Sequence, residues 1–486
     1  MAYRNGNDRN QGVLLPPSID EYIPHNHVVR AYDAFVDTLD LSEIGIELNP
    51  QKVGNSQYHP RLMLKLLLFG YSYGIHSSRK LERETYNNLA FIWLMKDLKP
   101  DHKTIAEFRR KNKEAIIQTM KLCARLCLKL NLIEGNVLFA DGTKIHANAG
   151  RKNQHSRNWY EKQLKEVGQR IRKLIAEAEE VDTAESGQGS WVQMPEEYAK
   201  EAYLKKTIEN ALEELADRGD LTKNGKERTI NRVDPKTTVM KSPQGIYPGY
   251  NIQSVVDDRN SLIVSIDAVS DANDAQQFSR QIKSAEDNLG KKCHIACADS
   301  GYSNLDQLHE VESDTTKVLV PSKKQISASP PKRFEKSEFT YDAHDDCYIC
   351  PEGNKLRFLR FQNKELTKRD YRIEKAGICR ECQYFGVCTN SRQGRTVVRH
   401  IYEELKETIE QRFNMEEYRC IYERRKARVE HPFGYFKKIL GFRQLGLRGL
   451  QGARTEASLL ATSFNITRMI GLLGGVEGFI EKVQAI

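Results

Sequence analysis

Two short segments of the chain, FADGT at 139–143 and CADSG at 297–301, repeat one pattern. In each segment an apolar run reaches an alanine, an aspartate follows, and small residues come next. Short apolar runs bounded by turn-forming residues favour buried strands. Ligands of α/β sheets bind beyond the carboxyl ends of strands. We therefore expect Asp141 and Asp299 to end two adjacent strands and to share one pocket.

These two aspartates predict a metal site. Two carboxylates held about 4–6 Å apart repel one another unless a cation lies between them. Mg²⁺ favours oxygen ligands and takes only one or two protein carboxylates per ion. With Glu430 as a third acid, Asp141, Asp299 and Glu430 would hold two Mg²⁺ or Mn²⁺ ions. Such a pair of ions activates a water or a hydroxyl for phosphodiester displacement.

Glu430 is the single carboxylate in RRKARVEHPFGYFKK, residues 424–438, which carries six Lys or Arg. The whole chain has 486 residues and a net charge of only +9, so the location of the basic residues is more informative than their total. This segment is expected to lie against phosphates. We predict DNA contacts from four of its side chains: Arg425, Lys426, Lys437 and Lys438.

Two further readings of this segment follow from local chemistry. Glu430 could instead form only surface ion pairs with Arg425 and Lys426, each worth less than about 1 kcal/mol. Pro432 disfavours helix at the preceding residue, so the helix that carries Glu430 should be kinked or should start nearby.

The remaining patterns predict a mixed sheet with flanking helices, preceded by an all-α part. Residues 1–17 are expected to form a flexible tail. Helical patterns at 59–74, 77–95 and 100–130 predict a helical DNA-binding domain over 18–132, although its basic residues would also suit a solvated helix face. The strands, a hairpin within 249–270 and a capped helix over 273–290 give a catalytic core over 133–302 and 401–475.

Two long segments interrupt this core. Residues 151–232 contain two amphipathic patterns separated by a Gly- and Ser-containing linker, which predicts a helical hairpin. Residues 303–400 hold half of the ten cysteines. The basic and aromatic residues between those cysteines suit either a ribbon that touches DNA or a solvated hairpin.

The cysteines of the second segment have the spacing of a zinc ribbon-like module. Two CxxC pairs and one further cysteine predict a structural, tetrahedral Zn²⁺ site, with one ligand position open between the last two candidates. Reduced thiols without metal are the alternative. Cys123, Cys127, Cys293 and Cys297 lie on apolar patterns and are expected in the core. The candidate zinc ligands are Cys347, Cys350, Cys379, Cys382 and Cys388.

Four blocks of the sequence, in this order, resemble the DDE transposases of bacterial insertion sequences. They are ADGTKIHANA, VMKSPQGIYPGYNIQSVVD, ADSGY and VEHPFGYFKKILGFRQLGLRG, and the resemblance runs from about residue 20 to 470. It implies an RNase H-like core with Asp141, Asp299 and Glu430 as the metal-binding triad. Related enzymes carry a Tyr-Arg-Glu-Lys signature, of which this chain keeps the Lys as Lys437.

The resemblance implies an enzyme that binds the terminal inverted repeats of its own element, cleaves their ends and joins them to target DNA. Double-stranded DNA is then the partner, and a homodimer is expected in the DNA complex. A DNA-binding protein without catalysis and a stand-alone nuclease are the alternatives. Because no apolar run has the about 20 residues of a membrane span, we expect a cytoplasmic, nucleoid-associated protein without a membrane partner.

Overall fold

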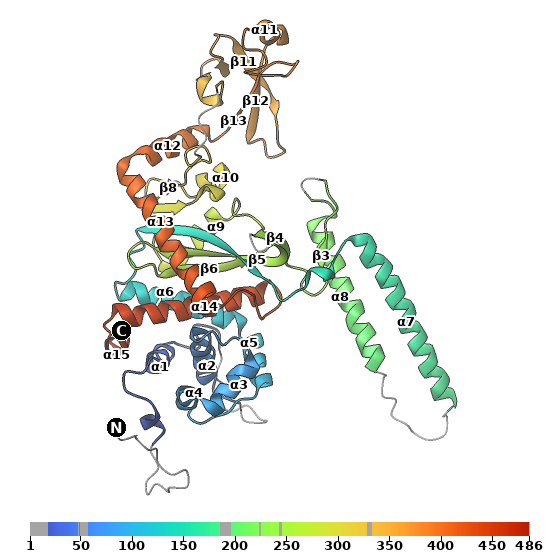
Figure 1. Ribbon diagram of the computed structural model, residues 1–486, viewed down its shortest axis with the longest axis vertical. Helices are drawn as coiled ribbons and strands as arrows, with labels where there is room; N and C mark the ends of the chain where they lie inside the picture. Colours follow the sequence, from blue (N-terminus) through green and yellow to red (C-terminus); the bar gives the residue numbers. More distant parts are fainter. Residues whose placement is uncertain are drawn as a thin grey trace, which may run out of the picture.

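A computed structural model describes residues 18–46, 48, 57–184, 196–222, 225–242, 245–327 and 333–485, so the predicted tail at 1–17 lies outside the described residues. A central sheet lies between N-terminal helices at the bottom of Figure 1 and a small β-rich module at its top, while two long helices project sideways. The chain is therefore a mixed α/β protein, as predicted.

The central sheet has six strands in the order β4-β5-β1-β7-β8, with β6 also paired to β5. Strand β1 runs antiparallel to β5 and parallel to β7. The predicted strands and hairpin are present, and β8 extends the sheet into the segment that we expected to be an insertion. The strands are β1 (Val137–His146), β4 (Thr238–Ser242), β5 (Gly245–Asp257), β6 (Ile263–Val269), β7 (Ile295–Ala298) and β8 (Lys317–Leu319).

Helices cover both faces of this sheet because side chains alternate along each strand. Leu138 and Ala140 of β1 point into the large core shared with α6, α9 and α14. Phe139 points to the opposite face and packs in a second cluster with Val429 of α13. The covering helices are α6 (Lys113–Lys129), α9 (Phe278–Leu289), α12 (Glu403–Asn414), α13 (Glu416–Gly434) and α14 (Leu450–Leu472).

The N-terminal helices pack on α14 and share the large core of the sheet. Two predicted helices are each divided in the structure. Asn88 is extended and its side chain accepts a hydrogen bond from the Ala90 amide (3.0 Å), so it begins a new helix. Asn112 divides the second helix and donates to the Phe108 carbonyl (2.8 Å). The helices are α1 (Val29–Asp37), α2 (Pro60–Ser72), α3 (Ser78–Asn87), α4 (Leu89–Leu94) and α5 (His102–Lys111), after the short η1 (Ile19–Tyr22).

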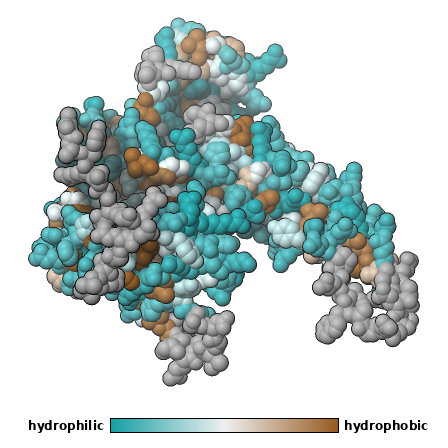
Figure 2. Space-filling model, turned by 60° about the horizontal axis from the view of Figure 1, so that its bottom comes forward, coloured by the Kyte–Doolittle hydropathy of each residue, from teal (hydrophilic) through white to brown (hydrophobic). Residues whose placement is uncertain are grey.

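The helical hairpin forms an arm, which we define as α7 (Arg157–Ala184) and α8 (Glu196–Arg218). It has its own small apolar core, which includes Tyr160, Val167 and Ile208. Figure 2 shows a mostly hydrophilic arm surface with isolated hydrophobic residues. The arm joins the sheet through η2 (Arg151–Asn153) and the short pair β2 (Gln154–His155) and β3 (Ile230–Asn231).

The Cys-rich module is a five-stranded antiparallel sheet in the order β13-β12-β11-β10-β9. Its core, with Tyr348, Leu356 and Tyr371, is separate from the main core. Its elements are η4 (Lys336–Glu338), β9 (Thr340–Asp342), β10 (Cys347–Ile349), β11 (Lys355–Phe361), β12 (Lys368–Ile373), α11 (Ala376–Glu381) and β13 (Thr396–His400).

Four short elements complete the fold: η3 (Ser300–Tyr302), α10 (Leu305–His309), η5 (Tyr435–Ile439) and α15 (Val476–Gln484). Among the described residues, no single helix is long and apolar enough to cross a membrane. Only α14 and α15 taken together reach that length and composition, with a bend of 104° between them. Most of α14 is buried against α2, α6 and β6. Its apolar character is therefore explained by its place in the core.

Candidate active site

Asp141 and Asp299 lie side by side where the parallel pairing of β1 and β7 ends. The last register pair of these strands is Ala140 with Ala298, and each aspartate is the next residue. β7 ends there and turns into η3, whereas β1 continues to His146 through its pairing with β5. Asp141 is thus not at the end of its own strand, contrary to our expectation, but at the point where that strand loses its neighbour.

A glycine follows each aspartate closely and fixes one of its carboxylate oxygens. The Gly142 amide donates to Asp141 Oδ1 (2.9 Å), and the Gly301 amide donates to Asp299 Oδ1 (2.7 Å). A Cβ atom at Gly301 would lie 2.8 Å from Asp299 Oδ1, which is closer than packed atoms allow. Gly301 is therefore required by the carboxylate of Asp299 beside it.

The electrostatics of the pair favour the neutral form of Asp141. The pKa of Asp141 is raised to about 6, mainly by burial and to a smaller extent by Asp299 and Asp274, while the Arg425 guanidinium and the Gly142 amide oppose the rise. Carboxylates that repel one another in a partly dry site are stabilised in the charged form by a cation. The oxygen donors here are of the kind that Mg²⁺ and Mn²⁺ prefer.

Glu430 lies on α13, the helix that crosses these strands. Its neighbour Val429 is buried with Phe139 and Cys297, which directly precede the Ala140 and Ala298 pair. The Glu430 side chain itself is exposed, and within the described ranges it forms no hydrogen bond or ion pair. The alternative in which Glu430 only pairs with its basic neighbours therefore does not describe the structure. Glu430 is near the aspartate strands without touching the aspartates.

Pro432 lies inside α13 rather than at a break. The helix begins at Glu416, well before Glu430, and continues past the proline to Gly434. A π-helical turn, η5, follows directly. Such a turn accommodates a disturbed hydrogen-bond ladder, which is how the chain keeps helix around a residue that lacks an amide N–H.

Two of the four predicted DNA-binding residues line the aspartate site. Lys437 donates a hydrogen bond to the Thr143 hydroxyl, two residues beyond Asp141 on the same face of β1. The Arg425 guanidinium lies 5.6 Å from the centre of the Tyr422 ring and lowers the pKa of Asp141. The other two predicted residues, Lys426 and Lys438, are exposed on the outside of the same segment.

Sequence reasoning missed a third carboxylate at this site. We expected the residues around Asp274 to cap the following helix, but α9 begins only at Phe278 and its N-cap makes no side-chain hydrogen bond. Instead, Asp274 Oδ1 accepts hydrogen bonds from Asn251 Nδ2 and Gln253 Nε2, both at 2.7 Å. The sequence does place Asp274 in a loop that follows a predicted strand. A single acid in a loop belongs to no periodic pattern, so the sequence does not distinguish it from other loop acids.

Four of the five candidate zinc ligands meet in one small pocket of the Cys-rich module, beside Phe334 and Tyr384. Burial and the other three thiols raise the pKa of the Cys388 thiol. Two backbone amides already point at sulfur, because Asn354 N lies 3.4 Å from Cys350 Sγ and Arg395 N lies 3.5 Å from Cys379 Sγ. Four cysteines around one pocket match the ligand number of a tetrahedral zinc site, although no three of these sulfurs lie within 4.8 Å of one another. The four are Cys350, Cys379, Cys382 and Cys388.

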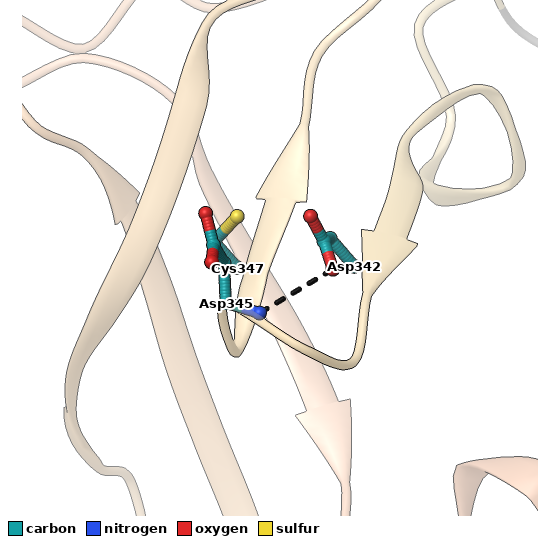
Figure 3. A group of neighbouring side chains, drawn as sticks. All are labelled: Asp342, Asp345 and Cys347. Atoms are coloured by element: carbon teal, nitrogen blue, oxygen red, sulfur yellow. Dashed lines mark hydrogen bonds between the residues drawn. The ribbon is translucent and has the colours of Figure 1, made fainter.

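The structure separates Cys347 from these four. It lies at the start of β10 and faces Asp342 and Asp345, whose ligand atoms are within 4.8 Å of one another and of its sulfur (Figure 3). Lys355 Nζ already binds Asp345 at 2.5 Å, and burial raises the pKa of the Cys347 thiol. Of the five predicted cysteines, four thus line one pocket and Cys347 lies apart from them.

Comparisons with known proteins match two segments of the chain to transposase domains. Residues 17–111 match the family model "Transposase domain (DUF772)", and residues 349–470 match the model "Transposase DDE domain". No curated protein matches the chain. Among solved structures, the piggyBac transposase synaptic complex with hairpin DNA is similar at 9% identity and a TM-score of 0.33, covering 94% of this chain and 79% of that one.

Both matched models describe parts of transposases, and they cover the helices before the sheet and the region that carries Glu430. The two matches together support a DDE transposase of an insertion sequence.

Proposed function

We propose that this transposase binds the terminal inverted repeats of its insertion sequence and catalyses metal-dependent DNA cleavage and strand transfer. The observation that carries the proposal is the meeting of Asp141 and Asp299 at the end of one parallel strand pair, beside Arg425 and Lys437. The central sheet with its helices, over 133–302 and 401–475, would be an RNase H-like core. Residues 18–132 would form the DNA-binding domain.

The residues of the chain suit this reaction in distinct roles. Asp141, Asp299 and Glu430 would hold two divalent ions, which supply activation of the attacking hydroxyl and stabilisation of the leaving oxygen. Glu430 is exposed on α13, so its side chain is free to turn toward the ions. Lys437, which donates a hydrogen bond to Thr143 near Asp141, would bind a phosphate of the substrate strand.

The exposed basic residues of α13 and η5 would hold the DNA backbone. Arg424 and Arg428 do not serve this role in the structure, because both bind Asp258, at 2.7 and 3.1 Å. Lys426 and Lys438 remain at the surface and extend the basic side of the site outward. Synapsis of two element ends implies a homodimer in the DNA complex, which light scattering of the DNA-bound protein measures.

The decisive experiment follows excision and rejoining of a marked DNA segment bounded by the inverted repeats that flank the gene. Purified wild-type protein with Mg²⁺ is expected to excise and join the segment. Asp299→Asn should bind the ends as the wild type does and leave the DNA intact. Asp287→Asn, which changes an exposed acid on the outer helix α9, is the matched control and should retain activity.

Two results would change the proposed function. Cleavage without joining by the wild type would indicate a stand-alone nuclease. Binding of the ends without cleavage by both wild type and Asp299→Asn would indicate a DNA-binding protein of transposase origin.

We also propose that Cys350, Cys379, Cys382 and Cys388 hold a structural Zn²⁺ ion, with Cys347 outside the ligand set. The purified wild-type chain should contain about one zinc per molecule by elemental analysis. Cys382→Ser should lose that zinc and lower the thermal stability of the module, because metal binding and folding of such modules are coupled. Cys347→Ser is the control and should keep its zinc; equal zinc loss in both variants would reject this set of four.

A further inference from the structure

Asp274 lies in the loop between β6 and α9 and turns its carboxylate toward the aspartate site. Asn251 and Gln253, successive inward residues of β5, both donate to its Oδ1 atom. The orientation of the Gln253 amide is fixed, because its Oε1 accepts from the Tyr302 hydroxyl at 2.5 Å and its Nε2 must therefore face Asp274. Tyr302 comes from η3, directly after Asp299.

The Asp274 carboxylate lies beside the glycines that follow the two site aspartates. A Cβ atom at Gly142 would lie 2.6 Å from Asp274 Oδ1, on the face of β1 opposite to the Asp141 side chain. A Cβ atom at Gly301 would lie 2.8 Å from Asp299 Oδ1 and 3.8 Å from Asp274 Oδ2. Two oxygens that lie so near one point are within reach of the same binuclear metal centre, whose ions are typically about 3.5–4 Å apart.

All three carboxylates are held in the same way. N–H donors engage Oδ1 of Asp141, Asp274 and Asp299, and in the described part of the chain no hydrogen bond reaches any of the three Oδ2 atoms. Donors that fix one oxygen and leave the other open are the arrangement by which outer residues orient a metal ligand. A helix-capping aspartate would accept hydrogen bonds from backbone amides of its helix, whereas Asp274 accepts from the side-chain amides of Asn251 and Gln253.

We propose that Asp274 is a further carboxylate ligand of the divalent-metal centre, beside Asp141 and Asp299. The inference rests on the proposed function, since it assigns a ligand to the same ions. Three aspartates offset more of the charge of two divalent ions than two aspartates do. They also place ligands on three strands or loops of one sheet edge, so the centre is largely formed before Glu430 turns in from α13.

The test measures Mn²⁺ binding to the full-length protein without DNA by isothermal titration calorimetry, together with the thermal midpoint of the metal-free protein. Asp274→Asn keeps the size and the hydrogen-bond acceptor of the side chain and removes its charge. It is expected to weaken Mn²⁺ binding by about tenfold or more, or to abolish one of two sites. It should also raise the metal-free midpoint, because one of three repelling carboxylates is gone. Asp287→Asn should leave both quantities unchanged.

The outcomes separate the two ideas. If Asp299→Asn weakens Mn²⁺ binding but Asp274→Asn binds Mn²⁺ like the wild type, Asp274 is only a structural acceptor and the inference is overturned, while the proposed function stands. A lowered metal-free midpoint with unchanged Mn²⁺ affinity has the same meaning. If the wild type itself binds no Mn²⁺, both the inference and the metal-dependent function fail.

Discussion

At the aspartate site, the atoms of neighbouring residues limit which side chains fit at a given position. Gly142 is required not for a turn but because a Cβ atom there would lie 2.3 Å from Gln253 Nε2 and 2.6 Å from Asp274 Oδ1. The family resemblance expects the Arg and Tyr of the Tyr-Arg-Glu-Lys signature at positions 426 and 423, which are Lys and Glu here. The preceding residues, Arg425 and Tyr422, are the pair that packs together, and Arg425 lowers the pKa of Asp141. The contacts in the structure therefore identify which Arg and Tyr lie near the aspartate site, whereas sequence spacing alone points to positions one residue away.

The raised pKa of Asp141 predicts a specific pH dependence. Its pKa is 3.8 in the unfolded chain and about 6 in the fold. The protonated aspartic acid contributes stability that is complete below pH 3.8 and is lost as the pH rises through 6. In metal-free buffer, Asp141→Asn should therefore gain stability relative to the wild type across this range, on the order of 2–3 kcal/mol by pH 7.

Thermal midpoints of both proteins with chelator, between pH 4 and pH 7, measure this difference. A constant offset between the two curves would show that Asp141 titrates normally in the fold. Added Mn²⁺ should remove the wild-type deficit, because an ion replaces the proton.

At the scale of elements, periodicity identified the strands and most of the helices, and local hydrogen bonding decided where they end. The apolar runs before Asp141 and Asp299 and the hairpin of β5 and β6 were predictable, because strand burial repeats every two residues. The divisions at Asn88 and Asn112 were not, since each depends on a side chain that bonds to a nearby backbone group. Asparagine favours helix caps over helix interiors, but the sequence alone does not show whether a given asparagine ends a helix.

The division at Asn88 leads to a stability prediction. Asn88→Ala removes the side-chain acceptor that caps α4 and should lower the free energy of unfolding by about 1 kcal/mol. Asn88→Asp, which keeps an acceptor at the same place, should restore most of it. Urea unfolding of the three proteins measures this, and an Ala variant as stable as the wild type would mean that packing of α4, not its cap, holds the break.

The fold decides which cysteines and which acids come together, and the spacing of these residues in the sequence does not predict it. Cys347 and Cys350 form one CxxC pair, but only Cys350 lines the pocket of the other thiols, because Cys347 begins strand β10 and faces Asp342. Asp274 is separated from Asp299 by a whole helix and a strand, and only the closed sheet brings them together. The acids on strands were predictable; the acid on the loop was not.

At the scale of the whole molecule, the arm has few ties to the rest: besides β2 and β3, Arg218 of α8 donates to the Lys236 carbonyl (2.9 Å) and the Thr238 hydroxyl (3.3 Å). Its core is its own, and it joins the sheet through β2 and β3, where His155 pairs with Ile230. Residues 157–228 replaced by a short Asn-Gly turn should leave that pair intact. We expect the shortened protein to fold, with its thermal midpoint within a few degrees of the wild type and unchanged Mn²⁺ binding.

Circular dichroism melting and calorimetry check this expectation. An aggregated product, or one that binds Mn²⁺ more weakly, would show that the arm supports the sheet. Full stability together with loss of end synapsis would instead assign the arm to DNA or subunit contacts.

The packing of α14 against the first helices has a consequence for the order in which the protein is made. Tyr71 donates to the buried Glu456 at 2.8 Å, and the two residues are 385 positions apart. A ribosome therefore releases α2 and α6 with their apolar faces uncovered long before their partner helix exists. The helices that cover the sheet from the C-terminal side, α13 and α14, are made only near the end of translation, so early fragments are candidates for chaperone capture.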